Sequence, residues 1–258
     1  MNIATSLIDH YSFEKSSETF HKNPVYTQKL HNKETKLLLV STGIVDTQFL
    51  GNLFSPSMFV FLSRHSSAKG IPTLSVHPPG NLAEAHFGGK PRSVSISPAA
   101  AMKHALQEMA KLTDERGLDY EVSYECTHHG PSLNAPAMFV ELGSSLEQWK
   151  DKIAAEVVAH TAVASVADCS SGSVVLGIGG PHYNKKFTKL ALGTQTAFGH
   201  MIPKYALADV DVEMLSQCVK KTLETVDSAV LDWKGIKGEH KPKIVTALEK
   251  LGVPSEKV

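Results

Sequence analysis

The stretch DYEVSYECTHHGP, residues 119–131, joins the pattern of a strand to a group of reactive side chains. Apolar and polar side chains alternate along it, as they do in a strand with one buried face. The two faces consist of Tyr120, Val122, Tyr124 and Cys126 and of Glu121, Ser123 and Glu125. Gly130-Pro131 then ends the alternation, since glycine and proline mark turns. We therefore predict a strand over 119–127 that runs into a turn.

That turn holds a carboxylate and two imidazoles, from Glu125, His128 and His129. Histidine exchanges protons near neutral pH and is the commonest metal ligand, and loops at strand ends often carry reactive groups. The three residues therefore predict either general base chemistry or a metal site. A solvated turn or a satisfied polar cluster is the alternative for a His-His pair taken alone. Cys126 is a further candidate, as a thiol nucleophile, although we expect its side chain on the face opposite Glu125.

Five more segments place a histidine where an apolar run breaks off. They are Arg64-His65-Ser66-Ser67, Val76-His77-Pro78-Pro79-Gly80-Asn81, Ala85-His86-Phe87-Gly88-Gly89, Gly179-Gly180-Pro181-His182-Tyr183, and the run from Phe198 to Tyr205 that contains His200. Each of these histidines alone is more typical of a loop or a core. At equivalent ends of a parallel sheet, however, they would converge in space, and such edges are common ligand sites.

Composition limits the class of protein. The chain has 258 residues, 42% of them hydrophobic, which is enough for a sizeable core. It has no apolar run of 18 residues and no signal-peptide pattern, so we expect a soluble cytoplasmic protein, and a monomer. Three distant cysteines argue against disulfides or a thiolate zinc site. The 26 basic residues balance the 26 acidic ones, so we expect no DNA partner and only local contacts to RNA.

Strand and helix patterns alternate along the chain, which predicts an α/β protein with an open, mixed, mostly parallel sheet flanked by helices. Expected strands are 2–7, 36–41, 57–63, 72–76, 119–127, 137–141, 173–178, 195–201 and 228–233. Expected helices start at the Ser97-Pro98 cap and end at Gly117, start at the Ser145 capping box and run towards Ala167, and cover about 185–190, 211–225 and 241–251. Residues 8–34 are polar, and we expect a helix with a loop or a variable insertion there. Residues 1–258 are taken as one domain, with separate lobes as an open alternative.

Common catalytic motifs are missing, including G-x-S-x-G, the P-loop and H-E-x-x-H. After the strand at 173–178, the free amides of Gly179 and Gly180 could bind an anion at a helix start, although G-x-G-G is no dinucleotide fingerprint. Lys185 and Lys186 follow and could meet an RNA backbone, or lie on an ordinary solvated helix face. Glu141 ends another apolar run and could accept a proton, bind a metal or amine, or support the next helix through its dipole.

Six segments in order resemble the archaeal and plant type of D-aminoacyl-tRNA deacylase. They are Arg64-His65-Ser66, 76–81, 125–131, 139–144 with Trp149, 177–183 and 199–205, and the match covers about residues 36–207. The resemblance implies hydrolysis of the ester between a D-amino acid and the terminal ribose of tRNA, with activity on aldehyde-modified D-aminoacyl-tRNAs in some members. It also implies bound zinc and a fold similar to peptidyl-tRNA hydrolase and the purine nucleoside phosphorylases.

The implied reaction needs an activated water, an oxyanion site and a grip on the tRNA end. Roles follow for residues that match the family's segments. The expected zinc ligands are His77, His128, His182 and His200; the expected catalytic groups are Glu125, His128, His129 and Glu141; the expected substrate contacts are Arg64, Gly179, Gly180, Lys185, Lys186 and Lys204. Adjacent His128 and His129 are expected to point apart. A metal-free mechanism, a peptidyl-tRNA hydrolase or metal-dependent amidohydrolase, and a non-catalytic module that binds the tRNA end stay open as alternatives.

Overall fold

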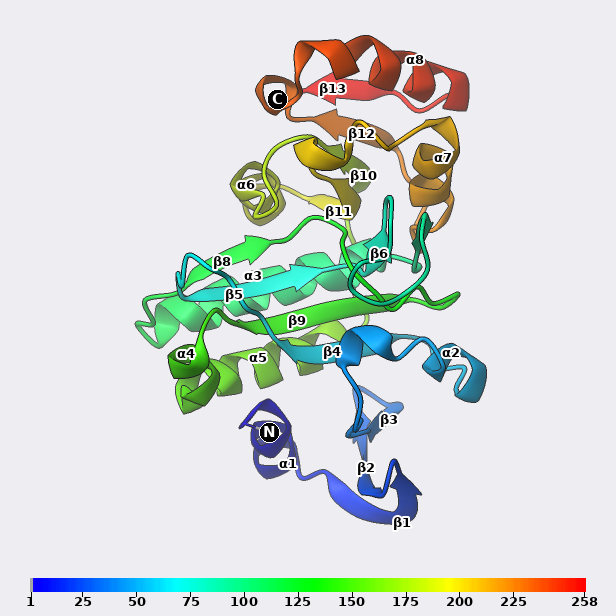
Figure 1. The fold of residues 1–258 in the computed structure, drawn as a ribbon. Coiled ribbons are helices and arrows are strands. Elements are labelled where there is room, and N and C mark those ends of the chain that lie inside the picture. Colours follow the sequence, from blue (N-terminus) through cyan, green and yellow to red (C-terminus); the bar gives the residue numbers. More distant parts are fainter. Residues whose placement is uncertain (1) are drawn as a thin grey trace.

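Two four-stranded sheets form the centre of the protein in a computed structural model that describes residues 2–258 (Figure 1). The mixed sheet has the order β4-β9-β5-β8, with β4 (Phe59–Arg64), β9 (Ala137–Gly143), β5 (Thr73–His77) and β8 (Glu121–Tyr124). The parallel sheet has the order β11-β10-β12-β13, with β11 (Thr196–Ile202), β10 (Ser173–Ile178), β12 (Ser228–Leu231) and β13 (Ser255–Lys257). They meet just beyond β8, where the amide of Thr127 donates to the carbonyl of Met201 at 2.8 Å. The predicted α/β class is confirmed, but several sheets replace the single open sheet.

The N-terminal region differs most from expectation. Residues 2–7 form a helix and no strand, because Ile3 and Leu7 lie one turn apart and are both buried, and α1 (Asn2–Tyr11) packs on a later helix. The expected helix with a loop over 8–34 is wrong beyond Tyr11. Three antiparallel strands stand there instead: β1 (Glu14–Phe20), β2 (Asn23–Leu30) and β3 (Lys33–Leu37). Their side chains are mostly exposed or half-buried, so the apolar alternation that reveals a strand is weak.

Helices cover the two central sheets. The remaining helices are α2 (Leu50–Leu53), α3 (Ala99–Glu115), α4 (Leu146–Lys150), α5 (Lys152–Ser165), α6 (Lys185–Gly193), α7 (Val212–Lys220) and α8 (Lys241–Leu251), with short 3-10 turns at Ile44–Asp46, Lys204–Ala206, Trp233–Gly235 and Gly238–His240. In Figure 1, α3 and α5 lie behind the mixed sheet, and α7 and α8 accompany the parallel sheet. The two short strands β6 (Gly80–Asn81) and β7 (Ser93–Val94) pair with each other. Over residues 2–258, no helix is long and apolar enough to cross a membrane.

Helix ends follow the sequence signals in part. The Ser145 capping box is present, but the helix it starts ends at Lys150, and Asp151 caps a second helix through the amide of Ala154. The start of α3 is not capped by Ser97. Instead, the carboxylate of Glu224 accepts hydrogen bonds from the amides of Ala99 and Ala100, at 3.0 and 2.9 Å.

Replacing Glu224 with alanine should leave these two helix amides without a protein partner and remove a negative charge from the positive end of the helix. We expect the free energy of unfolding to fall by about 1–2 kcal/mol, measured by urea denaturation. Glu224→Gln should lose less, since its amide oxygen still accepts. Glu249→Ala, an exposed substitution in α8, serves as the control, and an equal effect there would contradict the capping role.

Candidate active site

Histidines and two glutamates from five strands and their following turns converge in one cluster. His65 follows β4, His77 ends β5, Glu141 lies in β9, and Glu125 follows β8; His128 and His129 lie in the next turn, and His182 lies in the turn after β10. Three sets of these residues bring ligand atoms within 4.8 Å of one another: His77, His128 and His129; Glu125, His128 and His182; and His65, Glu125 and Glu141. The predicted histidine cluster therefore exists.

The pleat of the strands separates this cluster from the core. Along β9, Val140 and Leu142 belong to the core cluster that also includes residues of α3 and α5, whereas Glu141 points to the opposite face. The same alternation after β8 buries Cys126 in that core and leaves Glu125 in the cluster, as the sequence predicted. Burial raises the pKa of the Cys126 thiol to about 12, so Cys126 is no nucleophile.

The strand directions differ from the expectation that the histidines lie at equivalent ends of a parallel sheet. β4 runs parallel to β9 and β5 runs antiparallel to it, so His65 and His77 follow strands of opposite direction. The residues therefore do not lie along one carboxyl edge of a parallel sheet. They meet over one face of the mixed sheet, where the His77 ring stacks on Phe139 with centroids 4.9 Å apart.

Three histidines have their protonation sites fixed by backbone carbonyls. Nδ1 of His128 lies 2.8 Å from the carbonyl of Cys126, Nδ1 of His129 lies 2.7 Å from that of Gly130, and Nδ1 of His77 lies 3.3 Å from that of Pro78. A carbonyl oxygen only accepts, so each Nδ1 carries the proton and each Nε2 has a free lone pair. Nε2 of His77 is buried and has no hydrogen-bond partner. Such orphaned, unprotonated nitrogens, oriented by their second ring nitrogen, fit a metal ion.

His128 and His129 do not point apart. His129 has a φ of +42°, in the left-handed region, and this turns its ring back towards His128, with ring centroids 4.2 Å apart. Burial, together with the neighbouring imidazoles, holds the pKa of His128 well below its usual value and lowers that of His129 to about 4. Both rings are therefore neutral, the form that binds a metal.

The two carboxylates lie beneath the histidines. Glu125 is fully buried and Glu141 nearly so, and Nδ1 of His65 lies 3.4 Å from the first and 3.3 Å from the second. Burial alone raises the pKa of both carboxyl groups, but the imidazoles beside them, His182 at Glu125 and His65 with His77 at Glu141, bring each pKa below its usual value. Glu141 thus contacts histidines, and the alternative that it supports the next helix is wrong.

His182 stands between the buried carboxylate and solvent. Its Nε2 donates to Glu125 at 2.9 Å, and its Nδ1 lies 3.0 Å from the hydroxyl of Tyr205, with about a quarter of the side chain exposed. On the other side, Tyr183 contacts Nε2 of His65. Burial raises the pKa of each tyrosine to about 12, so both hydroxyls keep their protons at neutral pH. Sequence reasoning did not assign roles to His65, Tyr183 or Tyr205, although all three lie in the segments that it singled out.

His200 is not brought to the cluster. Its Nε2 lies 3.1 Å from the carbonyl of Ser95 and 3.2 Å from that of Lys221, and its Nδ1 lies 3.1 Å from the hydroxyl of Thr127. Both ring nitrogens are occupied, so the expected ligand role of His200 does not fit. The buried ring instead ties β11 to three segments that are distant in sequence.

Most of the residues that were expected to contact the substrate already interact with other groups of the protein. Gly179 and Gly180 form a left-handed turn, with φ of +101° and +79°, but the amide of Gly179 already donates to the carbonyl of Ile202. Lys185 pairs with Glu121 at 2.9 Å and Lys186 pairs with Asp232. The guanidinium of Arg64 lies over Trp149, 4.9 Å from the ring centroid. For Lys204, residues 2–258 provide no ion-pair partner.

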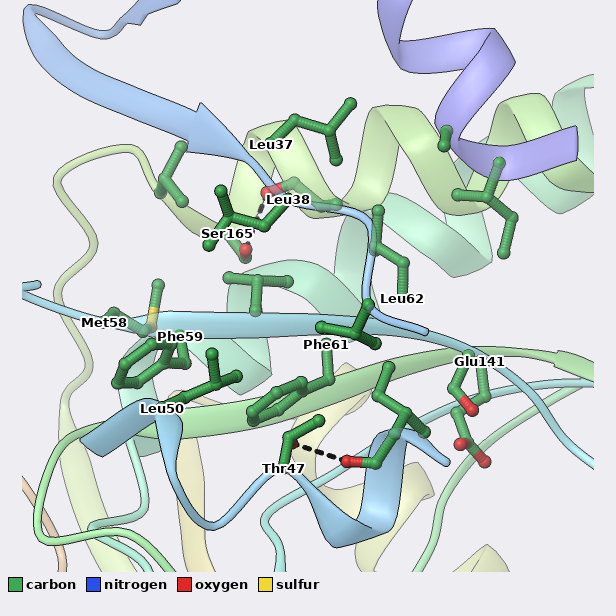
Figure 2. A pocket seen from close by; sticks show the side chains of 18 of the residues that line it. Leu37, Leu38, Thr47, Leu50, Met58, Phe59, Phe61, Leu62, Glu141 and Ser165 are labelled. Carbon is green, nitrogen blue, oxygen red and sulfur yellow. Dashed lines mark hydrogen bonds between the residues drawn. The ribbon is translucent and has the colours of Figure 1, made fainter. Parts of the chain in front are cut away.

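A cavity of about 1900 Å³ opens beside the cluster. His65, His128, His129, His182 and Tyr183 line it. Figure 2 shows Glu141 at one end, and along β4 the side chains of Phe61 and Phe59 on one side of the strand and that of Leu62 on the other. A polar reactive end thus adjoins a long apolar wall.

Known proteins with sequences related to this chain are described as D-aminoacyl-tRNA deacylases. The family model of D-aminoacyl-tRNA deacylase matches residues 53–256. The D-aminoacyl-tRNA deacylases of Pyrococcus furiosus and Thermococcus kodakarensis are each 38% identical, over 98% of this chain and 93% of the relative. That of Ignicoccus hospitalis is 39% identical over 78% of this chain and 81% of its own. The chain belongs to the D-aminoacyl-tRNA deacylase family.

The comparison with solved structures, like the sequence comparison, covers nearly the whole chain. The crystal structure of conserved protein of unknown function AF0625 superposes with a TM-score of 0.88 at 30% identity, and the match covers 99% of this chain and 90% of that one. The likeness to the deacylase family therefore reaches well beyond residues 36–207, both into the N-terminal strands and through the C-terminal helices.

The buried His200 of this deacylase-family chain should make stability depend on pH. Burial lowers its pKa to about 4, below the value of about 6.5 in the unfolded chain, so the unfolded state binds more protons between these values. The stability it provides is complete above pH 6.5 and is lost as pH falls towards 4. We expect wild type to lose about 2 kcal/mol more than His200→Gln between pH 7 and pH 5, in urea unfolding at each pH. Equal losses in both proteins would contradict this account.

Proposed function

We propose that this site hydrolyses the ester bond of D-aminoacyl-tRNA and releases the D-amino acid and tRNA. One observation carries the proposal: three imidazoles with free Nε2 atoms converge beside an ordered Glu125–His182 pair at the mouth of a large cavity. Membership of the deacylase family supplies the substrate, as it does for the relatives named above. Aldehyde-modified D-aminoacyl-tRNA belongs to the same proposal, since it carries the same ester.

We assign the metal to His77, His128 and His129, and infer zinc. Three imidazoles are a ligand set that zinc takes in catalytic sites, which keep a fourth position open. Bound there, zinc would polarise the ester carbonyl and lower the pKa of a water molecule. His182 is a weaker ligand than the sequence suggested, because its Nε2 already donates to Glu125.

We assign the proton transfers to side chains of the protein, with His182 and Glu125 in the main roles. His182 lines the cavity, and its Nδ1 accepts a hydrogen bond from the Tyr205 hydroxyl. The attacking water can give a proton to the Tyr205 oxygen as Tyr205 passes its own proton to Nδ1, while Glu125, on the other nitrogen, stabilises the imidazolium. When the carbonyl carbon breaks from the ribose oxygen, the same two groups can return a proton to the leaving oxygen. Glu125 is buried and acts through His182.

The apolar wall along β4 suits the amino-acid side chain of the ester. Phe59 and Phe61 lie on the same face of the sheet as Glu141, since Phe61 pairs with Phe139 and Ser63 pairs with Glu141, so a side chain placed against them would keep its ester at the cluster. The cytoplasmic location, the monomeric state and the likeness of the fold to peptidyl-tRNA hydrolase and the phosphorylases stay predictions from the sequence.

Metal binding should depend on the three histidines. We expect the wild-type protein, dialysed against zinc and then buffer, to keep bound zinc in elemental analysis. His77→Ala and His129→Ala should each weaken zinc binding about tenfold or more in calorimetric titration, because each removes a ligand nitrogen. His240→Ala, in a 3-10 turn outside the cluster, is the matched control. Zinc affinities that match wild type in both variants would refute this ligand set.

The Glu125–His182 pair should behave as a unit in catalysis. With D-tyrosyl-tRNA, His182→Ala should lower kcat about 100-fold or more while zinc affinity stays near wild type, since proton transfer is lost and the ligands are not. Glu125→Gln should also lower kcat, because its amide cannot stabilise the imidazolium. In the double variant the two losses should not add, since groups that act together are non-additive.

The controls for this experiment are an L-tyrosyl-tRNA substrate and Lys185→Ala. Lys185 is paired with Glu121 at the surface, so its removal should leave kcat close to wild type. Additive losses for Glu125 and His182 would show that they act independently. An absence of D-ester cleavage by wild type with zinc would refute the proposed function itself.

A further inference from the structure

The segment Ala85–Gly89 was singled out in the sequence, yet the cluster uses none of its side chains. It lies in the loop between β6 and β7 (Figure 1). Phe87 in this loop is 71% exposed, the highest value among the large hydrophobic residues within 2–258. Phe87 also lines the cavity that His128 and His129 line. An exposed aromatic ring beside a reactive cavity is available to contact a ligand.

The backbone holds this ring in place. The amide of Gly130, the residue after His129, donates to the carbonyl of Phe87 at 2.9 Å, and the amide of the Asn81 side chain donates to the carbonyl of Gly88 at 2.8 Å. Gly88 and Gly89 both have left-handed backbone, with φ of +68° and +78°. The loop and the histidine turn are therefore fastened together.

The close approach at this contact requires glycine. A Cβ on Gly88 would meet the carbonyl of Val45, and a Cβ on Gly89 would lie 2.8 Å from the hydroxyl of Ser132 and 2.9 Å from the Cα of Gly130. The chain thus gives up side chains on both residues to hold Phe87 against the histidine turn. A loop backbone fixed in this way loses little conformational freedom when a flat ligand stacks on the Phe87 ring.

We infer that Phe87 stacks on the base of the 3′-terminal nucleotide of the tRNA. This inference rests on the proposed function, and it names the part of the substrate that the loop contacts. The ester to be cleaved is attached to the ribose of that nucleotide, and the base is attached to the same sugar. With the ester at the histidines, the base must lie a short distance away at the cavity edge, where Phe87 projects. Aromatic side chains bind single-stranded bases by stacking of this kind.

The first test compares three substrates, D-tyrosyl-tRNA, D-tyrosyl-adenosine and D-tyrosine ethyl ester. Phe87→Ala should lower kcat/KM about tenfold or more for the two substrates that carry a base, chiefly through KM, and leave the ethyl ester unchanged. Phe87→Trp should stay near wild type, and Phe87→Leu should behave like Phe87→Ala, because leucine keeps apolar bulk without a flat ring. Leu53→Ala removes a side chain of similar exposure outside the cavity and should match wild type throughout.

A second measurement does not depend on hydrolysis. The trinucleotide cytidine-cytidine-2-aminopurine should lose fluorescence on binding wild type or Phe87→Trp, because stacking quenches the base, and should keep it with Phe87→Ala. Quenching that persists in Phe87→Ala, or is absent in wild type, overturns the inference even if D-esters are cleaved. An equal loss on the ethyl ester would also overturn it, because it would place Phe87 against the amino acid. If quenching follows Phe87 but no D-ester is cleaved, the stacking inference stands and the proposed function fails.

Discussion

Two carboxylates buried within reach of one imidazole are the constraint around which the site is built. Glu125 and Glu141 both approach Nδ1 of His65, in a region from which water is almost excluded. Two buried negative charges are strongly unfavourable unless cations or hydrogen-bond donors compensate them. His182, which donates a hydrogen bond to Glu125, meets part of that need. One oxygen of Glu125 and Nε2 of His77 still lack a hydrogen-bond partner, so the arrangement is most readily completed by a bound cation.

This constraint also fixes the register of the mixed sheet. Glu141 pairs in register with Ser63 on β4 and with Ser75 on β5, so small polar side chains flank it on both sides. A slip of one residue along β9 would turn Glu141 into the apolar core behind the sheet and bring Val140 or Leu142 to the site. The same argument holds for Glu125 beyond β8, where a slip would exchange it with Tyr124 or Cys126. Correct strand pairing and a working site are therefore the same requirement.

Some features of the fold and of the site can be predicted from local sequence, and others cannot. Alternation predicted that Glu125 and Cys126 would lie on opposite faces, and apolar runs located β10 to the residue, because both patterns depend only on near neighbours. The antiparallel direction of β5 against β9 was beyond reach, since it depends on pairing between segments 60 residues apart in the chain. The backbone of His129 was also beyond reach, because a left-handed φ at histidine is imposed by its surroundings. His200 looked like a ligand by its position at a strand end, and only its distant partners Ser95 and Lys221 show that both nitrogens are occupied.

The layering of the site explains how a chain of zero net charge can act on a polyanion. Of the lysines near the Gly179-Gly180 turn, Lys185 and Lys186 each pair with a carboxylate, and Lys204 has no ion-pair partner among residues 2–258. Under the proposed function, long-range attraction of the tRNA backbone by Lys185 and Lys186 is therefore weak, and binding must draw mainly on contacts at the end of the substrate. Those contacts are short-ranged: a base at the cavity edge, an ester at the histidines and a side chain along the wall of β4. A site of this kind reads the one place where an amino acid is attached and has little hold on tRNA elsewhere, which is what an enzyme needs if it must release its product tRNA to the pool.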